Sequence, residues 1–101
     1  ESIQYINEHI YESIRLTDMA QNLGVSSSIL YKAFIKVLGI SPISYIQKQK
    51  INYTQKRLLM GESLTSIAQE LGYSSAYHLS RTFKQKVGIS PRKYKQKMKS
   101  L

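Results

Sequence analysis

Hydrophobic residues recur along the first 24 positions with the spacing of two amphipathic helices. Isoleucines three or four positions apart predict a helix over residues 2–14 with an acidic outer face. A shorter helix is predicted over residues 16–24, with Thr17 as its N-cap, Asp18 in its first turn and Gly24 as its left-handed end. The residues expected to face inward are Ile3, Ile6, Ile10 and Ile14 in the first helix and Met19, Ala20 and Leu23 in the second.

The next helix shows two faces of different chemistry. It is expected to begin near Ser26, a cap candidate, and to end at Gly39. One face has apolar residues at i, i+3, i+4 and i+7 and is expected to join the core: Leu30, Ala33, Phe34 and Val37. The other face has the same spacing and mixed chemistry, which leaves it for other contacts: Ser28, Tyr31, Lys32 and Ile35.

A long helix is predicted between Ser41 and Met60, because Pro42 stands where a helix begins and no Gly interrupts the stretch before Gly61. Its inward residues are expected to be Tyr45, Ile46, Ile51, Thr54, Leu58 and Leu59, and its outward ones Lys48, Lys50, Lys56 and Arg57. The hydroxyl of Thr54 is expected to donate to a carbonyl one turn back. The helix is interpreted as a spacer.

The sequence on either side of this spacer is duplicated. Residues 16–27 align with residues 64–75 at an offset of 48, and after one inserted residue the offset is 49 up to Tyr45 and Tyr94. The alignment contains 15 identities, among them the segment GISP at 39–42 and at 88–91. Each copy reads as helix, glycine-containing turn, helix, which is the helix-turn-helix arrangement. The expected fold is therefore all-α with about seven helices, divided into a first helix-turn-helix subdomain (1–40), a linker helix (41–60) and a second subdomain (61–101).

The charge of the chain favours a polyanionic partner. The formal net charge is +9, the pI is about 9.9, and the sequence from Leu71 onward has eight bases and no acid. Nucleic acid is the first candidate and an anionic membrane surface the second. With no Cys, scattered carboxylates and no glycine-rich phosphate loop, we expect no catalytic residues, no metal and no cofactor.

The two mixed faces are the candidate DNA-contacting surfaces, since an α-helix fits the major groove of B-DNA. At offset 49 the face of the first copy corresponds to Tyr77, Ser80, Arg81 and Lys84 in the second. Arg81 could bind guanine through two hydrogen bonds, whereas Lys32 offers a single ammonium group. Hydroxyls and backbone N–H groups at the helix starts, together with nearby bases, are expected to contact phosphates: Ser26, Ser27, Lys36, Ser74, Ser75, Lys84, Arg92 and Lys93.

The chain resembles the C-terminal DNA-binding domain of the AraC/XylS family of bacterial transcription regulators over nearly its whole length. The most specific similarity lies in the second copy: Ile67, Ala68, Leu71, Gly72, Tyr73, Ser75, Tyr77, His78, Leu79, Ser80, Arg81, Phe83, Lys84, Gly88, Ile89, Ser90, Pro91 and Tyr94. The chain departs from the usual family pattern at Ser28 and Lys32, where larger or more basic residues are common. It also departs at Lys50, where Arg is usual, and at Thr54, where Ala is usual.

The resemblance implies seven helices and binding to successive major grooves of double-stranded promoter DNA. Base contacts carried over by position fall on Ser28, Tyr31 and Lys32, and on Ala76, Tyr77, Ser80 and Arg81. The resemblance also implies a cytoplasmic protein at the bacterial nucleoid, RNA polymerase as a candidate partner, and an effector or dimerisation domain outside this chain.

Two other classes of function remain open from the sequence. A basic helical module could bind RNA or an anionic membrane, although that function needs no duplicated turn. A protein–protein adaptor would lack the steep salt dependence of phosphate contacts. It is also open whether Tyr31 and Tyr77 instead cover the core and whether Lys32 and Arg81 only lie along their own helices.

Overall fold

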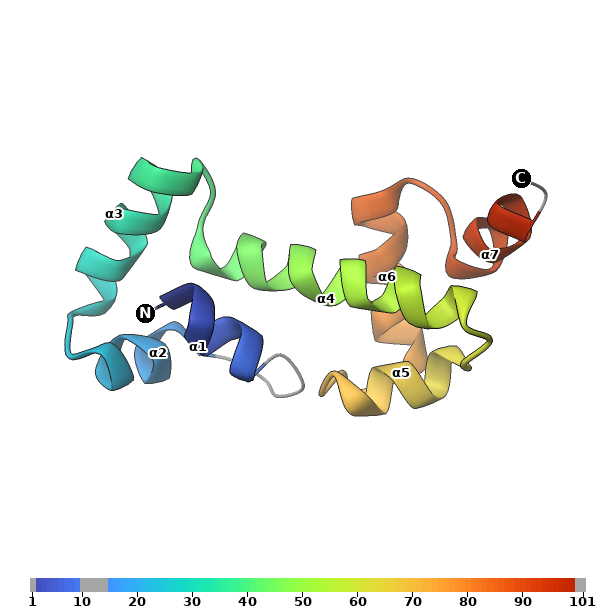
Figure 1. Cartoon of the computed structure of the whole chain (residues 1–101), viewed down its shortest axis with the longest axis horizontal. Coiled ribbons are helices and arrows are strands. Elements are labelled where there is room, and N and C mark those ends of the chain that lie inside the picture. Colours follow the sequence, from blue (N-terminus) through green and yellow to red (C-terminus); the bar gives the residue numbers. More distant parts are fainter. Residues whose placement is uncertain (1, 10–14, 100–101) are drawn as a thin grey trace. The chain divides into compact units, whose positions relative to one another are not determined.

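Seven α-helices and no strand make up the part of the chain that the structure, a computed structural model, describes: residues 2–9 and 15–99 (Figure 1). The helices are α1 (Ser2–Glu8), α2 (Leu16–Leu23), α3 (Ser27–Leu38), α4 (Pro42–Leu59), α5 (Leu64–Glu70), α6 (Ala76–Val87) and α7 (Pro91–Lys99). The all-α prediction is confirmed. The chain divides within α4 into two compact units, unit 1 (residues 1–49) and unit 2 (residues 50–101).

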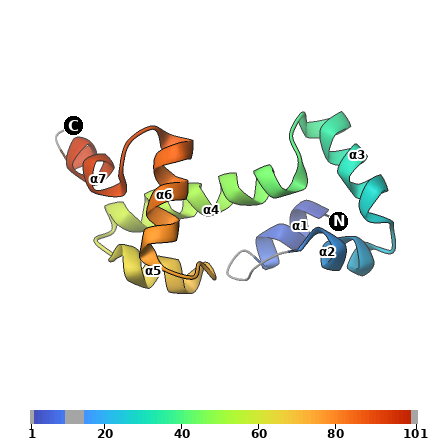
Figure 2. The same cartoon turned by 180° about the vertical axis from the view of Figure 1, so that it is seen from behind.

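Unit 1 packs α1, α2, α3 and the first half of α4 around one apolar core. In both views α2 lies beside α1 and leads into α3 (Figures 1 and 2). Its buried residues are Ile6, Met19, Ala20, Leu30, Phe34 and Ile46. Ile10, Ile14 and the side chain of Ile3, which were also expected to face inward, lie outside what the structure describes.

The start of α2 differs from the prediction. Arg15 is the N-cap, no side chain makes the capping hydrogen bond there within the described part of the chain, and Thr17 lies inside the first turn. The prediction that Thr17 caps this helix is therefore wrong. The helix includes Leu16 because this side chain packs against the core of unit 1. Asp18 stands in the first turn and Gly24 is left-handed (φ 72°), as predicted.

The apolar stripe predicted for α3 is only half right. Leu30 and Phe34 are buried, but Ala33 is exposed and Val37 is 78% exposed. Val37 stands in the last turn before the chain leaves the helix at Gly39, so it lies beyond the core that Leu30 and Phe34 contact. The face with Ser28, Tyr31, Lys32 and Ile35 is exposed, as expected.

In unit 2, residues of α4, α5 and α6 are buried: Ile51, Thr54, Leu58, Ile67, Ala68, Leu71, Leu79 and Phe83. The Thr54 hydroxyl donates to the Lys50 carbonyl at 2.8 Å, as predicted. Leu59 was expected to face inward and is 51% exposed, because it ends the helix just before Gly61 turns the chain. Lys50 was expected to face outward and is buried, because its ammonium group donates to the Leu71 carbonyl at 2.9 Å.

From α3 and α6 onward, the helix ends of the two copies match at an offset of 49. Ser26 and Ser75 cap α3 and α6, and Gly39 and Gly88 end them in left-handed conformations. Ser41 and Ser90 accept the N–H groups of Ser44 and Lys93 in the first turns of α4 and α7. The inserted residue of the second copy therefore lies in the turn before Ser75, and not after it as the sequence alignment placed it.

Candidate nucleic-acid interface

The candidate recognition helix of unit 2, α6, which bears one of the two candidate DNA-contacting faces, is fixed by its cap and by its buried face. The Ser75 side chain accepts the His78 N–H at 3.1 Å, and Leu79 and Phe83 are fully buried. These contacts turn the other face outward, where Tyr77 is 71% exposed and Arg81 and Lys84 are exposed. The Arg81 guanidinium lies over the Tyr77 ring, 5.9 Å from its centre. This cation–π contact holds the guanidinium above the start of the helix.

The corresponding helix of unit 1, α3, is built in the same way. The Ser26 side chain accepts the Ile29 N–H at 3.1 Å, and Leu30 and Phe34 face the core. Ser28, Lys32 and Tyr31 are exposed on the opposite side, with Tyr31 46% exposed. Both candidate recognition helices thus present their predicted faces to solvent.

None of the fifteen predicted site residues, all of which lie in the described part of the chain, is buried. Those that are half-buried stand at the start of a candidate recognition helix or beside its buried face: Ser27, Ala76 and Ser80. Ser26 and Ser75 use a lone pair for capping, so each hydroxyl proton can still be donated to an anion. The alternative that Tyr31 and Tyr77 cover the core is wrong, given their exposure.

The turn before α6 is held by contacts of Lys50 and Tyr73, neither of which the sequence prediction had assigned to the candidate site. The Lys50 ammonium group donates to the carbonyl of Leu71 and lies 5.4 Å from the centre of the Tyr73 ring. The Tyr73 ring packs edge-on against His78 at 5.2 Å, and His78 also pairs with the Ser74 hydroxyl at 3.3 Å. Burial raises the pKa of Tyr73 and lowers that of Lys50. The family departure at Lys50 was the one sequence signal that pointed to this position.

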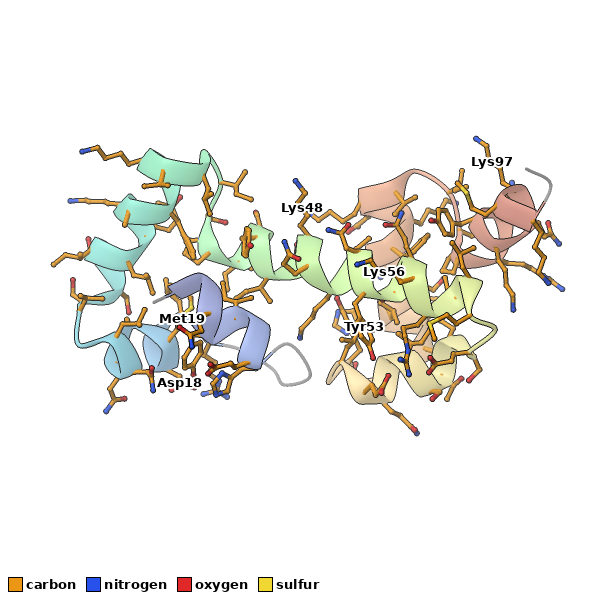
Figure 3. All side chains as sticks on the ribbon, viewed as in Figure 1. Asp18, Met19, Lys48, Tyr53, Lys56 and Lys97 are labelled. Atoms are coloured by element: carbon orange, nitrogen blue, oxygen red, sulfur yellow. The ribbon has the colours of Figure 1, made fainter. Side chains whose placement is uncertain are left out.

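The carboxylates of unit 2 are occupied within their own unit. Arg57 forms ion pairs with Glu62 and, at 3.7 Å, with Glu70, and the Tyr53 hydroxyl donates to Glu70 at 3.0 Å. Tyr53 and Lys56 are labelled on α4 in Figure 3, and Lys97 extends from α7. Because Glu62 and Glu70 are the only acids in the sequence of unit 2, the exposed bases of α6 and α7 have no acidic side chain close to them in sequence.

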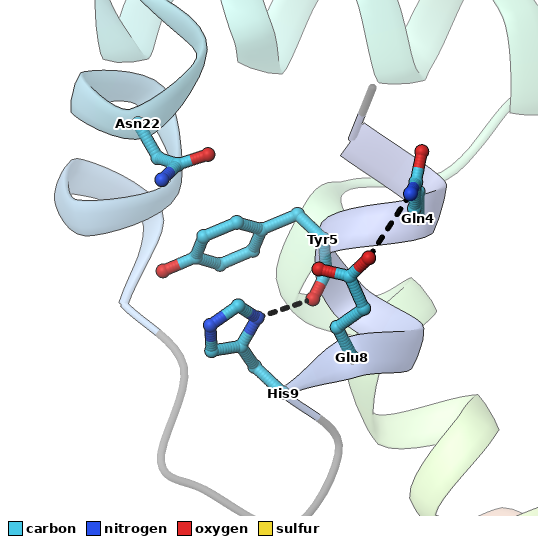
Figure 4. A pocket seen from close by; sticks show the side chains of 5 residues that line it. All are labelled: Gln4, Tyr5, Glu8, His9 and Asn22. Carbon is cyan, nitrogen blue, oxygen red and sulfur yellow. Dashed lines mark hydrogen bonds between the residues drawn. The ribbon is translucent and has the colours of Figure 1, made fainter.

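A small open pocket of about 220 Å³ lies in unit 1, between α1 and α2 (Figure 4). The rings of Tyr5 and His9 stack at 4.1 Å, and a ring nitrogen of His9 lies 2.8 Å from the Tyr5 carbonyl. Gln4 donates to Glu8 at 3.0 Å, and Asn22 completes the lining. The one acidic side chain in this lining makes the pocket a poor phosphate site.

Within residues 2–9 and 15–99, no group of three or more His, Asp or Glu side chains is placed to hold a metal ion. No single helix there is long and apolar enough to cross a membrane, although α3 and α4, bent by 61° where they meet, reach that length and hydropathy as a pair.

Comparison with known proteins matches the chain to a helix-turn-helix domain model over residues 19–97. The regulatory protein PocR of Salmonella typhimurium is 27% identical over 97% of the chain, which spans 33% of PocR. A transcriptional regulator of Chromobacterium violaceum with an AraC-type DNA-binding domain is 28% identical and superposes with a TM-score of 0.86, covering 95% of this chain and 87% of that one. The DNA-binding domain of AdpA, solved in complex with a target DNA, shares the fold at 22% identity and a TM-score of 0.84, covering 98% and 90% of the two chains.

Proposed function

We propose that α3 and α6 each enter the major groove of one DNA duplex, because the chain belongs to the AraC family of bacterial helix-turn-helix DNA-binding domains. This is a family of transcription regulators and not of enzymes. The observation that carries this proposal is the repetition at offset 49 of a capped helix with one buried and one exposed face. Two exposed faces built alike, one in each unit, are what recognition of two half-sites requires.

The base contacts are proposed on the exposed faces and the phosphate contacts around them. Bases are contacted by Ser28, Tyr31 and Lys32 of α3 and by Ala76, Tyr77, Ser80 and Arg81 of α6. Phosphates are contacted by Ser26, Ser27, Lys36, Ser74, Ser75, Lys84, Arg92 and Lys93. The exposure of these side chains and the hydroxyls at both helix starts support the assignment.

The role of the whole protein is proposed on the same basis. The curated relative PocR is about three times as long as the aligned region. We propose that the chain works in the bacterial cytoplasm, at the nucleoid, beside an effector or dimerisation domain, and that it regulates promoters with RNA polymerase as a partner. Within the chain, residues 1–40 and 61–101 would form the two helix-turn-helix subdomains and residues 41–60 their linker helix.

The test is selection of bound duplexes from a random DNA pool, followed by footprinting on the selected sequence. We expect enrichment of one bipartite sequence and two short protected segments about one helical turn apart on one face of the duplex. Equal displacement of the selected duplex by unrelated DNA, RNA or acidic lipid vesicles at moderate salt would instead indicate a non-specific polyanion-binding module.

A further inference from the structure

The first recognition helix exposes far more apolar surface than the second. Among the described residues of α6, Tyr77 is the only large hydrophobic side chain that is exposed. In α3 five are exposed: Ile29, Tyr31, Ile35, Val37 and Leu38. Single exposed hydrophobic residues are ordinary on soluble proteins, so what each of the five can contact depends on the face of the helix on which it lies.

Ile35 is the member of this group that lies on the candidate DNA-contacting face. It follows Ser28 by seven positions and Lys32 by three, so the three side chains share one stripe of α3. Ile35 is 41% exposed, while Leu30 and Phe34 of the same helix are buried. At offset 49 its counterpart in α6 is Lys84, an exposed base. The same position is therefore apolar in one copy and cationic in the other.

The two units differ in charge as the two helix positions do: unit 1 is less cationic than unit 2. Unit 1 contains four bases and four acids and is formally neutral, whereas unit 2 contains eleven bases and two acids and holds the whole net charge of +9. Attraction to phosphates therefore favours unit 2. If α3 adds to binding and specificity, contacts with base edges must supply a larger share of its binding free energy than they supply for α6.

We propose that Ile35 is a specificity-determining residue that contacts the C5-methyl group of a thymine in the major groove. Thymine is the only one of the four bases that presents a methyl group there. Packing that methyl group against the Ile35 side chain removes apolar surface of both from water. The first half-site then contains a T·A pair opposite Ile35, next to the base pair that Lys32 contacts. This inference rests on the proposed function, because it assumes that α3 lies in the major groove.

The test uses the duplex selected from the random pool and replaces its thymines, one at a time, by deoxyuridine, which lacks only the methyl group. Wild type is expected to lose affinity about fourfold at one thymine, the effect of roughly one buried methyl group. Ile35→Ala should bind the unsubstituted duplex several-fold more weakly and should show no further loss when that thymine is replaced.

Val37→Ala is the matched control, because Val37 is an exposed aliphatic residue of the same helix that lies off this stripe. It should keep the fourfold loss, and circular dichroism should show equal helix content for all three proteins. If no thymine loses its methyl dependence in Ile35→Ala, the inference is wrong and sequence-specific binding stands. If the pool yields no enriched sequence, the proposed function fails as well.

Discussion

Lys50 lies on the opposite side of its helix from the one that its sequence pattern predicted. Helical periodicity predicted that it lies on the solvent side of α4, but it is only 8% exposed. Its ammonium group donates a hydrogen bond to the carbonyl of Leu71. Leu71 closes α5, and Tyr73 lies in the turn before α6. Periodicity reports which face of a helix is apolar, but it does not reveal a carbonyl at a neighbouring helix end that needs a donor.

Replacing Lys50 by Met should destabilise the folded chain by about 1–3 kcal/mol at neutral pH, because the Leu71 carbonyl loses its donor. Burial lowers the pKa of Lys50 in the folded state, so the unfolded chain binds this proton more tightly. The contribution of Lys50 to stability should therefore rise with pH toward the ordinary lysine pKa of about 10.4. Urea unfolding of both proteins from pH 7 to 9.5 measures the difference.

The free-energy gap between wild type and Lys50→Met should widen over that pH range. Burial raises the pKa of the nearby Tyr73, so its hydroxyl stays neutral over most of this range. A gap that narrows with rising pH would mean that the contact with the Tyr73 ring stabilises the ammonium form more than burial destabilises it.

Arg81 is the residue of α6 for which the largest effect on base preference is expected. Its guanidinium is exposed, lies over the Tyr77 ring and can form two parallel hydrogen bonds with guanine. Arg81→Ala should weaken binding to the selected duplex by about 1–3 kcal/mol and relax the preference at one base pair. Titration of duplexes with each base pair at that position measures both effects.

Arg81→Lys is the control for charge alone. It keeps the cation but loses the two-pronged geometry, so it should recover part of the affinity and little of the base preference. An equal loss on every duplex with Arg81→Ala would assign this side chain to a phosphate.

At the scale of the elements, the sequence predicted the helices well and their faces less well. Serine caps and left-handed glycines are local signals, so the ends of α3 and α6 could be located from Ser26, Gly39 and Gly88. Which residues of a face reach the core depends on where the neighbouring helices end, and this is not local information. Val37 shows the difference, since it has the core spacing and yet is 78% exposed.

The buried stripe of α6 gives the corresponding stability prediction. Phe83 is fully buried, and its ring meets Tyr94 of α7 edge-on at 5.6 Å. Phe83→Ala should therefore cost about 3–5 kcal/mol of unfolding free energy, measured by urea or thermal unfolding. Val37→Ala should change it by less than about 0.5 kcal/mol. A similar cost for the two variants would show that Val37 is packed in the folded protein.

At the scale of the whole chain, the duplication and the charge pattern were enough to predict where the two candidate contact faces lie. The two exposed faces followed from residues at offset 49, such as Lys32 and Arg81, because the same pattern occurring twice separates contact positions from core positions. The excess of bases toward the end of the chain was visible in the sequence, and the division of the chain within α4 assigns the whole net charge to unit 2. It leads to a prediction about which bases control the response to salt.

The affinity for the selected duplex should fall steeply with salt, and the bases assigned to phosphates should account for the slope. Each phosphate contact contributes about −0.9 to the slope of log K against log salt concentration. Lys84→Ala and Lys93→Ala in unit 2, and Lys36→Ala in unit 1, should each make the slope shallower by about 0.9 and weaken binding to all sequences alike.

Lys48→Ala is the matched control, because Lys48 is an exposed base outside the proposed interface. Measuring the affinity from about 50 to 300 mM salt distinguishes contacts with particular phosphates from a response to the net charge of the whole chain. If Lys48→Ala changes the slope as much as Lys84→Ala does, the chain responds to its net charge as a whole, and the assigned phosphate contacts are wrong.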